Sequence, residues 1–173
     1  MKSFDRSFSQ PQQPQQQAQP RPRPPFSVLI ADDKAEVRSA LRLLLDQEDD
    51  MEVVGEARDG KELLAQAERL EPSLLLLDWE LNRGGLSADI PGLQGGRTNL
   101  AIVALSGRPE ARKAALLAGV DAFVSKGEPP ERLLAAIRQA HATTHAKTHP
   151  GRMDISDSQQ ASTEKGEKHE NSA

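Results

Sequence analysis

The chain has 173 residues, a formal net charge of -4 and no cysteine. This length suits one domain with tails, and the absence of cysteine excludes disulfide bonds and thiol chemistry. The mixed charge gives no reason to expect nucleic acid as a partner, because binding to its backbone needs a basic surface. The segment Met1–Gln19 lacks the apolar core of a secretory signal, and no apolar run is long enough to cross a bilayer. We therefore expect a cytoplasmic protein without membrane association.

The sequence predicts a polar tail at each end of the chain. Residues 1–25 form an arm rich in Gln and Pro, and residues 143–173 are dominated by Ser, Thr, Lys, Glu and His. Neither segment holds enough large apolar side chains to build a core, so both are expected to be disordered. The folded domain is therefore expected at residues 26–142.

Within this domain, apolar runs alternate with amphipathic helical patterns. In chain order they predict a strand at Phe26–Ala31, a helix through Val37 and Leu45, a strand at Met51–Ala57, a helix through Leu63 and Leu70, a strand at Ser73–Asp78, a strand at Leu100–Ser106, a helix at Ala111–Ala118, a strand at Asp121–Ser125 and a helix opened by Pro129 and Pro130. The crossover at Asn82–Asn99 is rich in glycine. The third helix is therefore expected to be short or irregular, within Leu86–Gln94 at most.

Alternating strands and helices predict an α/β fold with a five-stranded parallel sheet covered on both faces. The flavodoxin-like strand order 2-1-3-4-5 is the commonest for such a sheet. Ligands of this fold bind at the carboxyl ends of the first and third strands.

Polar side chains stand where the predicted strands end. Asp32 and Asp33 follow the first strand, Asp78 ends the third, Ser106 ends the fourth and Lys126 follows the fifth. Three carboxylates gathered at one edge would repel one another, and Mg²⁺ would remove that cost. An aspartate can accept a phosphoryl group, and a metal ion with a lysine would neutralise the charge on its oxygens. The set therefore suits phosphoryl acceptance.

Each of these residues also has a structural interpretation. Asp33 and Glu36 fit a helix capping box, while Asp78 and Ser106 fit loop starts and Lys126 fits a solvated charge. Four independent strand ends with matching groups favour the functional interpretation.

A second candidate metal site is disfavoured. His141, His145 and His149 are spaced by four residues, but Thr143, Thr144 and Pro150 argue against a stable helix there.

Four segments together resemble the receiver domains of two-component response regulators: Val28–Asp33 (VLIADD), Leu74–Asp78 (LLLLD), Ile102–Gly107 (IVALSG) and Ala122–Lys126 (AFVSK). The resemblance covers the whole folded segment. It implies a phosphoprotein of a two-component phosphorelay, phosphorylated by a sensor histidine kinase or a phosphotransfer protein, and not an enzyme.

The same resemblance assigns roles to individual residues. Asp78 would be the phosphoacceptor. The Mg²⁺ ligands would be Asp33 directly, Asp32 mainly through water, Asp78 and the backbone carbonyl of Glu80. Ser106 would be the switch hydroxyl, Lys126 the phosphate-pairing lysine and Phe123 the rotating aromatic.

The resemblance leaves the output open. Gly127 stands where many receivers have Pro, and the segment Lys126–Leu134 looks like receivers joined to helix-turn-helix output domains. No such domain follows, so we expect a stand-alone receiver that acts through an unknown protein partner. The resemblance places the output face at roughly residues 108–118, 121–125 and 129–140. The partner would be acidic, or a second copy of the domain, because Arg112, Lys113, Arg132 and Arg138 fall on this predicted output face.

Two alternatives remain. One is a pseudo-receiver that serves as a constitutive interaction module, which the eroded third helix favours. The other is an aspartate-nucleophile hydrolase of the haloacid dehalogenase group, which Glu80 disfavours because that group carries an Asp at this position.

Overall fold

The structure is a computed structural model that describes residues 24–81, 90–95 and 99–148. The predictions for nearly all of the N-terminal arm, for residues 149–173 of the tail and for most of the glycine-rich crossover lie outside the described residues. No helix in the described ranges is long and apolar enough to span a bilayer.

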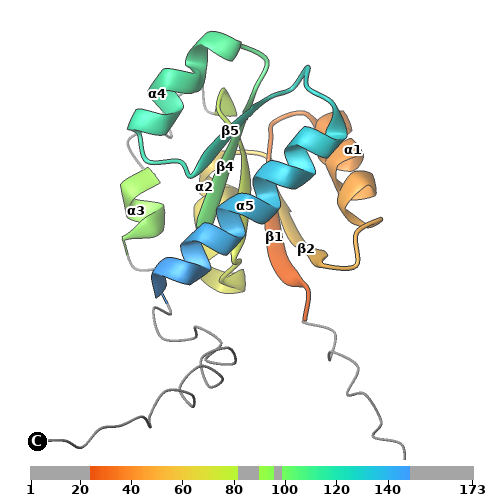
Figure 1. Cartoon of the computed structure of the whole chain (residues 1–173), viewed down its shortest axis with the longest axis vertical. Helices are drawn as coiled ribbons and strands as arrows, with labels where there is room; N and C mark the ends of the chain where they lie inside the picture. The colour runs from red at the N-terminus through yellow and green to blue at the C-terminus, as the bar shows by residue number, and fades with distance from the viewer. Residues whose placement is uncertain (1–23, 82–89, 96–98, 149–173) are drawn as a thin grey trace, which may run out of the picture.

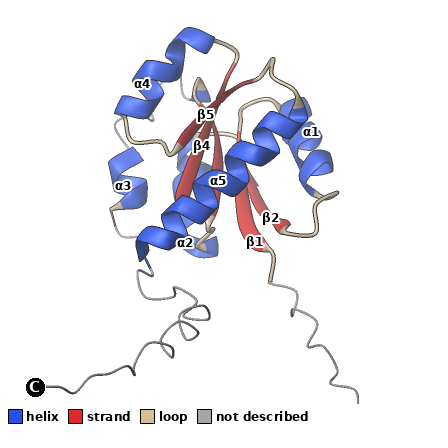
Figure 2. Cartoon of the chain, in the orientation of Figure 1, coloured by secondary structure: helices blue, strands red, loops and turns tan. Residues whose placement is uncertain are grey.

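A parallel sheet of five strands forms the centre of the domain (Figures 1 and 2). Its strands are β1 (Phe26–Ala31), β2 (Met51–Ala57), β3 (Leu74–Asp78), β4 (Ala101–Ser106) and β5 (Ala122–Ser125). They lie in the order β2-β1-β3-β4-β5, and every neighbouring pair is parallel. The predicted flavodoxin-like order is therefore confirmed.

Helices cover both faces of this sheet, as parallel strands require. They are α1 (Ala35–Leu45), α2 (Gly60–Leu70), α3 (Ile90–Gln94), α4 (Arg112–Leu117, preceded by a 3₁₀ turn at Pro109–Ala111) and α5 (Pro130–Thr148). One buried cluster joins the sheet to α1 and α5, and the other joins it to α2, α3 and α4.

Strand β3 shows why the central strands read as unbroken apolar runs. Its leucines alternate between the two clusters, with Leu74 and Leu76 facing α1 and α5 and with Leu75 and Leu77 facing the other helices. Because side chains alternate across a strand, a strand buried on both faces needs apolar residues at every position. The run ends at Asp78, where the sheet reaches its edge.

The third helix is short, as predicted, since α3 holds five residues. The last helix is longer than expected, because α5 continues past Ala142 to Thr148. The predicted end of the folded segment at 142 is therefore too early. Tertiary contacts explain the extension: Thr144 is buried, and the ring of His141 stacks on Phe26 with centroids 4.1 Å apart.

This extension brings two of the three spaced histidines together, while His149 lies outside the described residues. The rings of His141 and His145 lie 4.2 Å apart. Burial and the neighbouring His145 lower the pKa of His141 to about 4. Within the described ranges, no third metal-ligating side chain joins this pair, so the structure adds no support for a metal site here.

Candidate functional site

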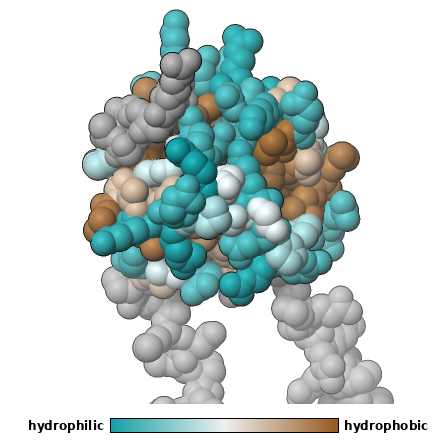
Figure 3. All heavy atoms as spheres, turned by 90° about the horizontal axis from the view of Figure 1, so that it is seen from above, coloured by the Kyte–Doolittle hydropathy of each residue, from teal (hydrophilic) through white to brown (hydrophobic). Residues whose placement is uncertain are grey.

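The carboxyl edge of the sheet collects the side chains that the sequence singles out. Asp32 and Asp33 follow β1, Asp78 ends β3, Ser106 ends β4 and Lys126 follows β5. Because β1, β3, β4 and β5 are parallel and lie next to one another in that order, their carboxyl ends lie along one edge of the sheet. This edge is uppermost in Figure 1, and Figure 3 views it from above.

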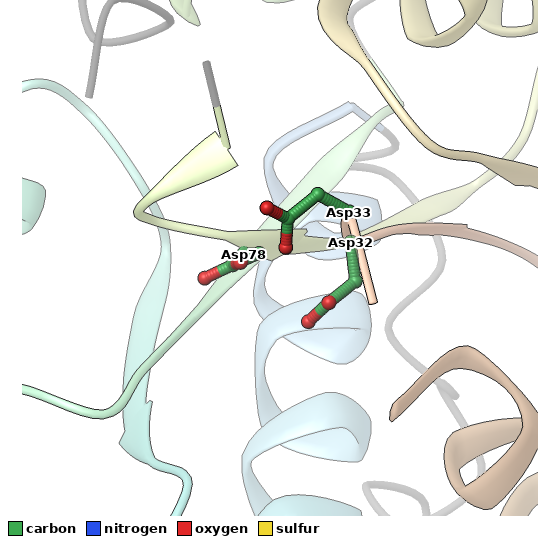
Figure 4. A group of neighbouring side chains, drawn as sticks. All are labelled: Asp32, Asp33 and Asp78. Carbon is green, nitrogen blue, oxygen red and sulfur yellow. The ribbon is translucent and has the colours of Figure 1, made fainter. Parts of the chain in front are cut away.

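Three aspartates form an acidic cluster at this edge (Figure 4). Asp32 and Asp78 are buried, with 1% and 3% of their surface exposed, whereas Asp33 is exposed. One carboxylate oxygen from each lies within 4.8 Å of the other two. Such close like charges repel one another unless a cation lies among them.

Asp33 does not cap α1, so the predicted capping box with Glu36 is wrong. The N-cap residue is Lys34, and no side chain caps the helix. The Lys34 backbone N–H donates instead to Asp32 Oδ1 at 2.9 Å, which turns the chain before the helix begins. The Asp33 carboxylate makes no hydrogen bond or ion pair with residues in the described parts of the chain. It is therefore available to an external ligand.

Lys126 provides the cation in this structure. Its Nζ donates to Asp32 Oδ2 at 2.7 Å and lies 3.2 Å from Asp78 Oδ1. The backbone fixes the lysine, because the Lys126 N–H donates to the Ser106 carbonyl at 2.8 Å. Burial alone would lower the pKa of Lys126, but the hydrogen bond to Asp32 and the charges of both aspartates outweigh it and raise this pKa.

Burial also perturbs Asp78. It raises the pKa of the Asp78 carboxyl above its ordinary value, and the hydrogen bond from the Glu80 N–H with the charge of Lys126 offsets only part of that rise. A carboxyl whose pKa is perturbed by burial and by a specific charge partner, at a ligand-binding edge, is typical of a functional site.

Ser106 lies beside this cluster and is fully buried. Its hydroxyl donates to Glu80 Oε1 at 2.6 Å, with the Arg108 carbonyl as a second acceptor at 3.2 Å. It accepts the Arg108 N–H at 2.9 Å. The Arg108 side chain in turn donates from Nε to Glu80 Oε1 at 3.1 Å. Although burial raises the pKa of Glu80, the hydrogen bonds from Ser106 and Arg108 contribute to a net lowering.

Sequence reasoning missed this use of the Glu80 and Arg108 side chains. It assigned only the backbone carbonyl of Glu80, and it placed Arg108 on the output face. The spacing offers only a partial signal: Glu80 stands two residues after Asp78, Arg108 stands two residues after Ser106, and β3 and β4 are neighbouring strands. Glu80 and Arg108 therefore stand the same number of residues beyond the ends of two neighbouring strands.

Phe123 lies away from the polar groups. It is buried in β5 and belongs to the cluster that joins the sheet to α2, α3 and α4. Its backbone carbonyl accepts Arg112 Nη1 from α4 at 3.3 Å. Phe123 therefore links β5, which precedes Lys126, to helix α4.

The donor set at this edge fits Mg²⁺. This ion prefers carboxylate oxygens and retains several water ligands. The structure offers two buried carboxylates and one exposed, unpaired carboxylate with oxygens within 4.8 Å of one another. The acidic cluster, a neighbouring lysine and a buried hydroxyl provide the groups that phosphoryl transfer to a carboxylate requires.

A doubly wound parallel sheet with an acidic cluster at its carboxyl edge is an α/β architecture that binds ligands at that edge. The model of the response regulator receiver domain family matches residues 28–138. The chain therefore belongs to the response regulator receiver domain family.

Curated relatives agree with this assignment. The nitrate/nitrite response regulator NarL of Escherichia coli K12 is 31% identical over 129 residues, covering 68% of this chain and 56% of the relative. The transcriptional regulatory protein DesR of Bacillus subtilis 168 is 34% identical over 114 residues, covering 65% of this chain and 57% of the relative. The match thus spans little more than half the length of these relatives.

Solved structures show the same fold. The response regulator domain of Thermotoga maritima CheB is 30% identical, with a TM-score of 0.59, covering 68% of this chain and 97% of that chain. The receiver domain of AraT from Geobacillus stearothermophilus is 26% identical, with a TM-score of 0.61, covering 71% of this chain and 98% of that chain.

Proposed function

We propose that this receiver is a phosphorylation-dependent switch in the cytoplasm, in which Asp78 accepts a phosphoryl group from a sensor histidine kinase or a phosphotransfer protein. The observation that carries this proposal is the position of Asp78, a buried carboxylate 3.2 Å from Lys126 Nζ within the acidic cluster. A carboxylate in this setting can attack phosphorus, and the lysine offsets the charge that arrives with the phosphoryl group.

The transfer uses groups of this chain in simple roles. An Asp78 oxygen forms the new P–O bond while the P–N bond of the donor phosphohistidine breaks and its electron pair leaves with the imidazole. The chain is the acceptor, so it acts as a substrate of the kinase and not as an enzyme. Lys126 pairs with the phosphoryl oxygens, and Ser106 donates a hydrogen bond to one of them. Phe123 then turns into the space that Ser106 vacates.

Mg²⁺ would be held by Asp33, by Asp32 through water, by Asp78 and by the backbone carbonyl of Glu80. Its contribution is to neutralise negative charge on the carboxylates and on the phosphoryl oxygens.

This ligand set predicts the effect of Asp33→Asn. We expect Mg²⁺ affinity to fall by about tenfold or more, because one charged ligand is lost, which corresponds to about 1.4 kcal/mol. The free energy of unfolding without Mg²⁺ should change by less than about 0.5 kcal/mol, because Asp33 is exposed and caps no helix. Titration of Trp79 fluorescence with Mg²⁺ measures the first quantity and urea unfolding the second.

Asp49→Asn is the matched control, since Asp49 is also exposed but lies in the loop before β2. Equal Mg²⁺ affinity in the Asp33 and Asp49 variants would exclude Asp33 as a ligand.

Phosphoryl acceptance is tested by intact-mass spectrometry. Incubation with a small acyl phosphate and Mg²⁺ should add one phosphoryl group to the wild-type chain, and none when a chelator removes the metal. Asp78→Asn should stay unlabelled because an amide oxygen does not form the acyl phosphate. Equal labelling of the wild type and the variant would place the acceptor elsewhere.

The alternative, a constitutive interaction module, is favoured by the short α3, which holds only five residues. The same mass experiment separates the two functions, because such a module would take no phosphate under any of these conditions.

The output surface is proposed at the face formed by α4, β5 and α5. A cleft of about 650 Å³ lies there, lined by residues that include Arg112, Phe123, Arg132 and Lys147. The exposed Leu116 of α4 also lines it, and Figure 3 shows apolar surface on the flanks of a mostly hydrophilic edge. We propose an acidic protein or a second copy of the domain as the downstream partner.

One residue assigned to this face is misplaced. Arg138 forms ion pairs with Glu48 and Asp50, which precede β2, at 2.5 and 2.8 Å. Its charge is therefore neutralised on the side of α1 and β2. The basic character of the output face rests on Arg112, Lys113 and Lys147 instead, since Arg132 pairs with Glu128 at 3.5 Å.

A further inference from the structure

The hydroxyl of Ser106 is already engaged before any phosphate arrives. It is fully buried and donates to Glu80 Oε1 at 2.6 Å. This distance is typical of a charge-assisted hydrogen bond from a hydroxyl to a carboxylate, which is about twice as strong as a neutral one. The second acceptor, the Arg108 carbonyl, lies further away at 3.2 Å.

Arg108 holds the carboxylate in this position. Its Nε donates to the same oxygen of Glu80 at 3.1 Å, while its backbone N–H donates to Ser106 Oγ at 2.9 Å. Glu80 therefore connects the end of β3 to the loop after β4. These contacts form a closed set of three residues, which we call the Glu80 latch (Glu80, Ser106 and Arg108).

A serine hydroxyl carries one proton and can donate it to one acceptor at full strength. While Ser106 donates to Glu80, it cannot donate in the same way to a phosphoryl oxygen on Asp78. The Glu80 carboxylate would also repel that dianionic group at short range. Glu80 and the phosphoryl group therefore compete for the same hydroxyl.

We propose that the Glu80 latch stabilises the unphosphorylated state and that phosphorylation of Asp78 requires Glu80 to release Ser106. This inference rests on the proposed function, because it presumes phosphate on Asp78. The side chain of Glu80 thereby opposes the switch, and Arg108 is a positioning residue that acts through Glu80.

The energetic consequence is a reduced apparent affinity for any ligand that needs the open latch. The apparent affinity of such a ligand is its intrinsic affinity multiplied by the fraction of molecules in which the latch is open. Removing the latch therefore raises the apparent affinity. Loss of one hydrogen bond to a charged group should change this affinity by about tenfold, or about 1.4 kcal/mol.

Beryllofluoride with Mg²⁺ is the probe, and Trp79 fluorescence reports binding. We expect Glu80→Ala to bind it about tenfold more tightly than the wild type. Glu80→Gln should lie between the two, because its amide oxygen still accepts from Ser106 without a charge. Arg108→Ala should raise the affinity in the wild-type background and should not raise it further in the Glu80→Ala background.

Glu110→Ala is the matched control. It removes a carboxylate from the 3₁₀ turn that follows Arg108, where Glu110 is exposed and forms no ion pair with the described residues. Unchanged affinity in Glu110→Ala together with the increase in Glu80→Ala would support the latch.

Three results would overturn it. Unchanged or weaker binding in Glu80→Ala would mean that Glu80 does not oppose the switch, and an equal increase in Glu110→Ala would reduce the effect to general charge. A further increase from Arg108→Ala in the Glu80→Ala background would show that Arg108 acts on its own. Failure of the proposed function is distinct, since the wild type and Asp78→Asn would then bind the probe alike.

Discussion

Lys126→Met will destabilise the domain and nearly abolish phosphoryl acceptance. The Lys126 ammonium lies 2.7 Å from Asp32 Oδ2 and 3.2 Å from Asp78 Oδ1, and both carboxylates are buried. Removing one partner of a buried ion pair leaves an uncompensated charge. Because the lysine side chain is 23% exposed, we expect a loss of about 2–3 kcal/mol at neutral pH, below the full range for a completely buried pair. Urea unfolding measures it.

Lys113→Met makes the same chemical change at an exposed position on α4. We expect this control to change the free energy of unfolding by less than about 0.5 kcal/mol. Adding Asp32→Asn to Lys126→Met should restore part of the lost stability, because the unpaired carboxylate is then gone, and a double-mutant cycle measures that coupling. Equal stability of the two Met variants would show that the ion pairs contribute nothing.

The second large effect is a gain in stability on Asp78→Asn, measured without Mg²⁺. The variant removes one of two buried like charges, while its side-chain oxygen can still accept the Glu80 N–H, which lies 3.1 Å from Asp78 Oδ1. Lys126 retains Asp32 as a partner. We expect a gain on the order of 1 kcal/mol at neutral pH, the usual size of a single-substitution effect.

The gain should depend on pH in a defined direction. Burial raises the pKa of Asp78 in the folded chain above its ordinary value of 3.8. Between pH 3.8 and this raised pKa, the folded state therefore holds a proton that the unfolded state has lost. The contribution of Asp78 to the free energy of unfolding therefore falls as pH rises through that window and stays low above it. The difference between Asp78→Asn and the wild type should grow over the same window.

Urea unfolding in the presence of a chelator, repeated from pH 3.8 upward, gives this difference directly. A variant less stable than the wild type at neutral pH would mean that the pair with Lys126 outweighs burial. The pKa of Asp78 would then be lowered, contrary to the structure.

Much of the fold follows from the sequence because this sheet is buried on both faces. The run Leu74–Leu77 is apolar at every position, so it could be recognised as a central strand without homologues. The strand order and the edge on which strands end then follow from general rules of parallel sheets. Asp78, Ser106 and Lys126 could be placed together for the same reason.

Details that depend on tertiary contacts could not be predicted. Thr143 and Thr144 are poor helix formers, yet α5 continues through them because Thr144 is buried and the His141 ring stacks on Phe26. The start of α1 depends on a hydrogen bond from Lys34 to Asp32 that competes with a capping box. Side-chain contacts between loops, such as that of Glu80 with Arg108, depend on loop paths that spacing alone does not determine.

Chemical identification of the phosphorylated residue tests the central claim most directly. Hydride reduction of the phosphorylated chain converts an aspartyl phosphate to homoserine, and peptide mapping then locates the changed residue. We predict homoserine at position 78 and unchanged aspartate at positions 32 and 33. Homoserine at 32 or 33, or a phosphorylated chain with no reduced aspartate, would contradict the assignment of Asp78 as the phosphoacceptor.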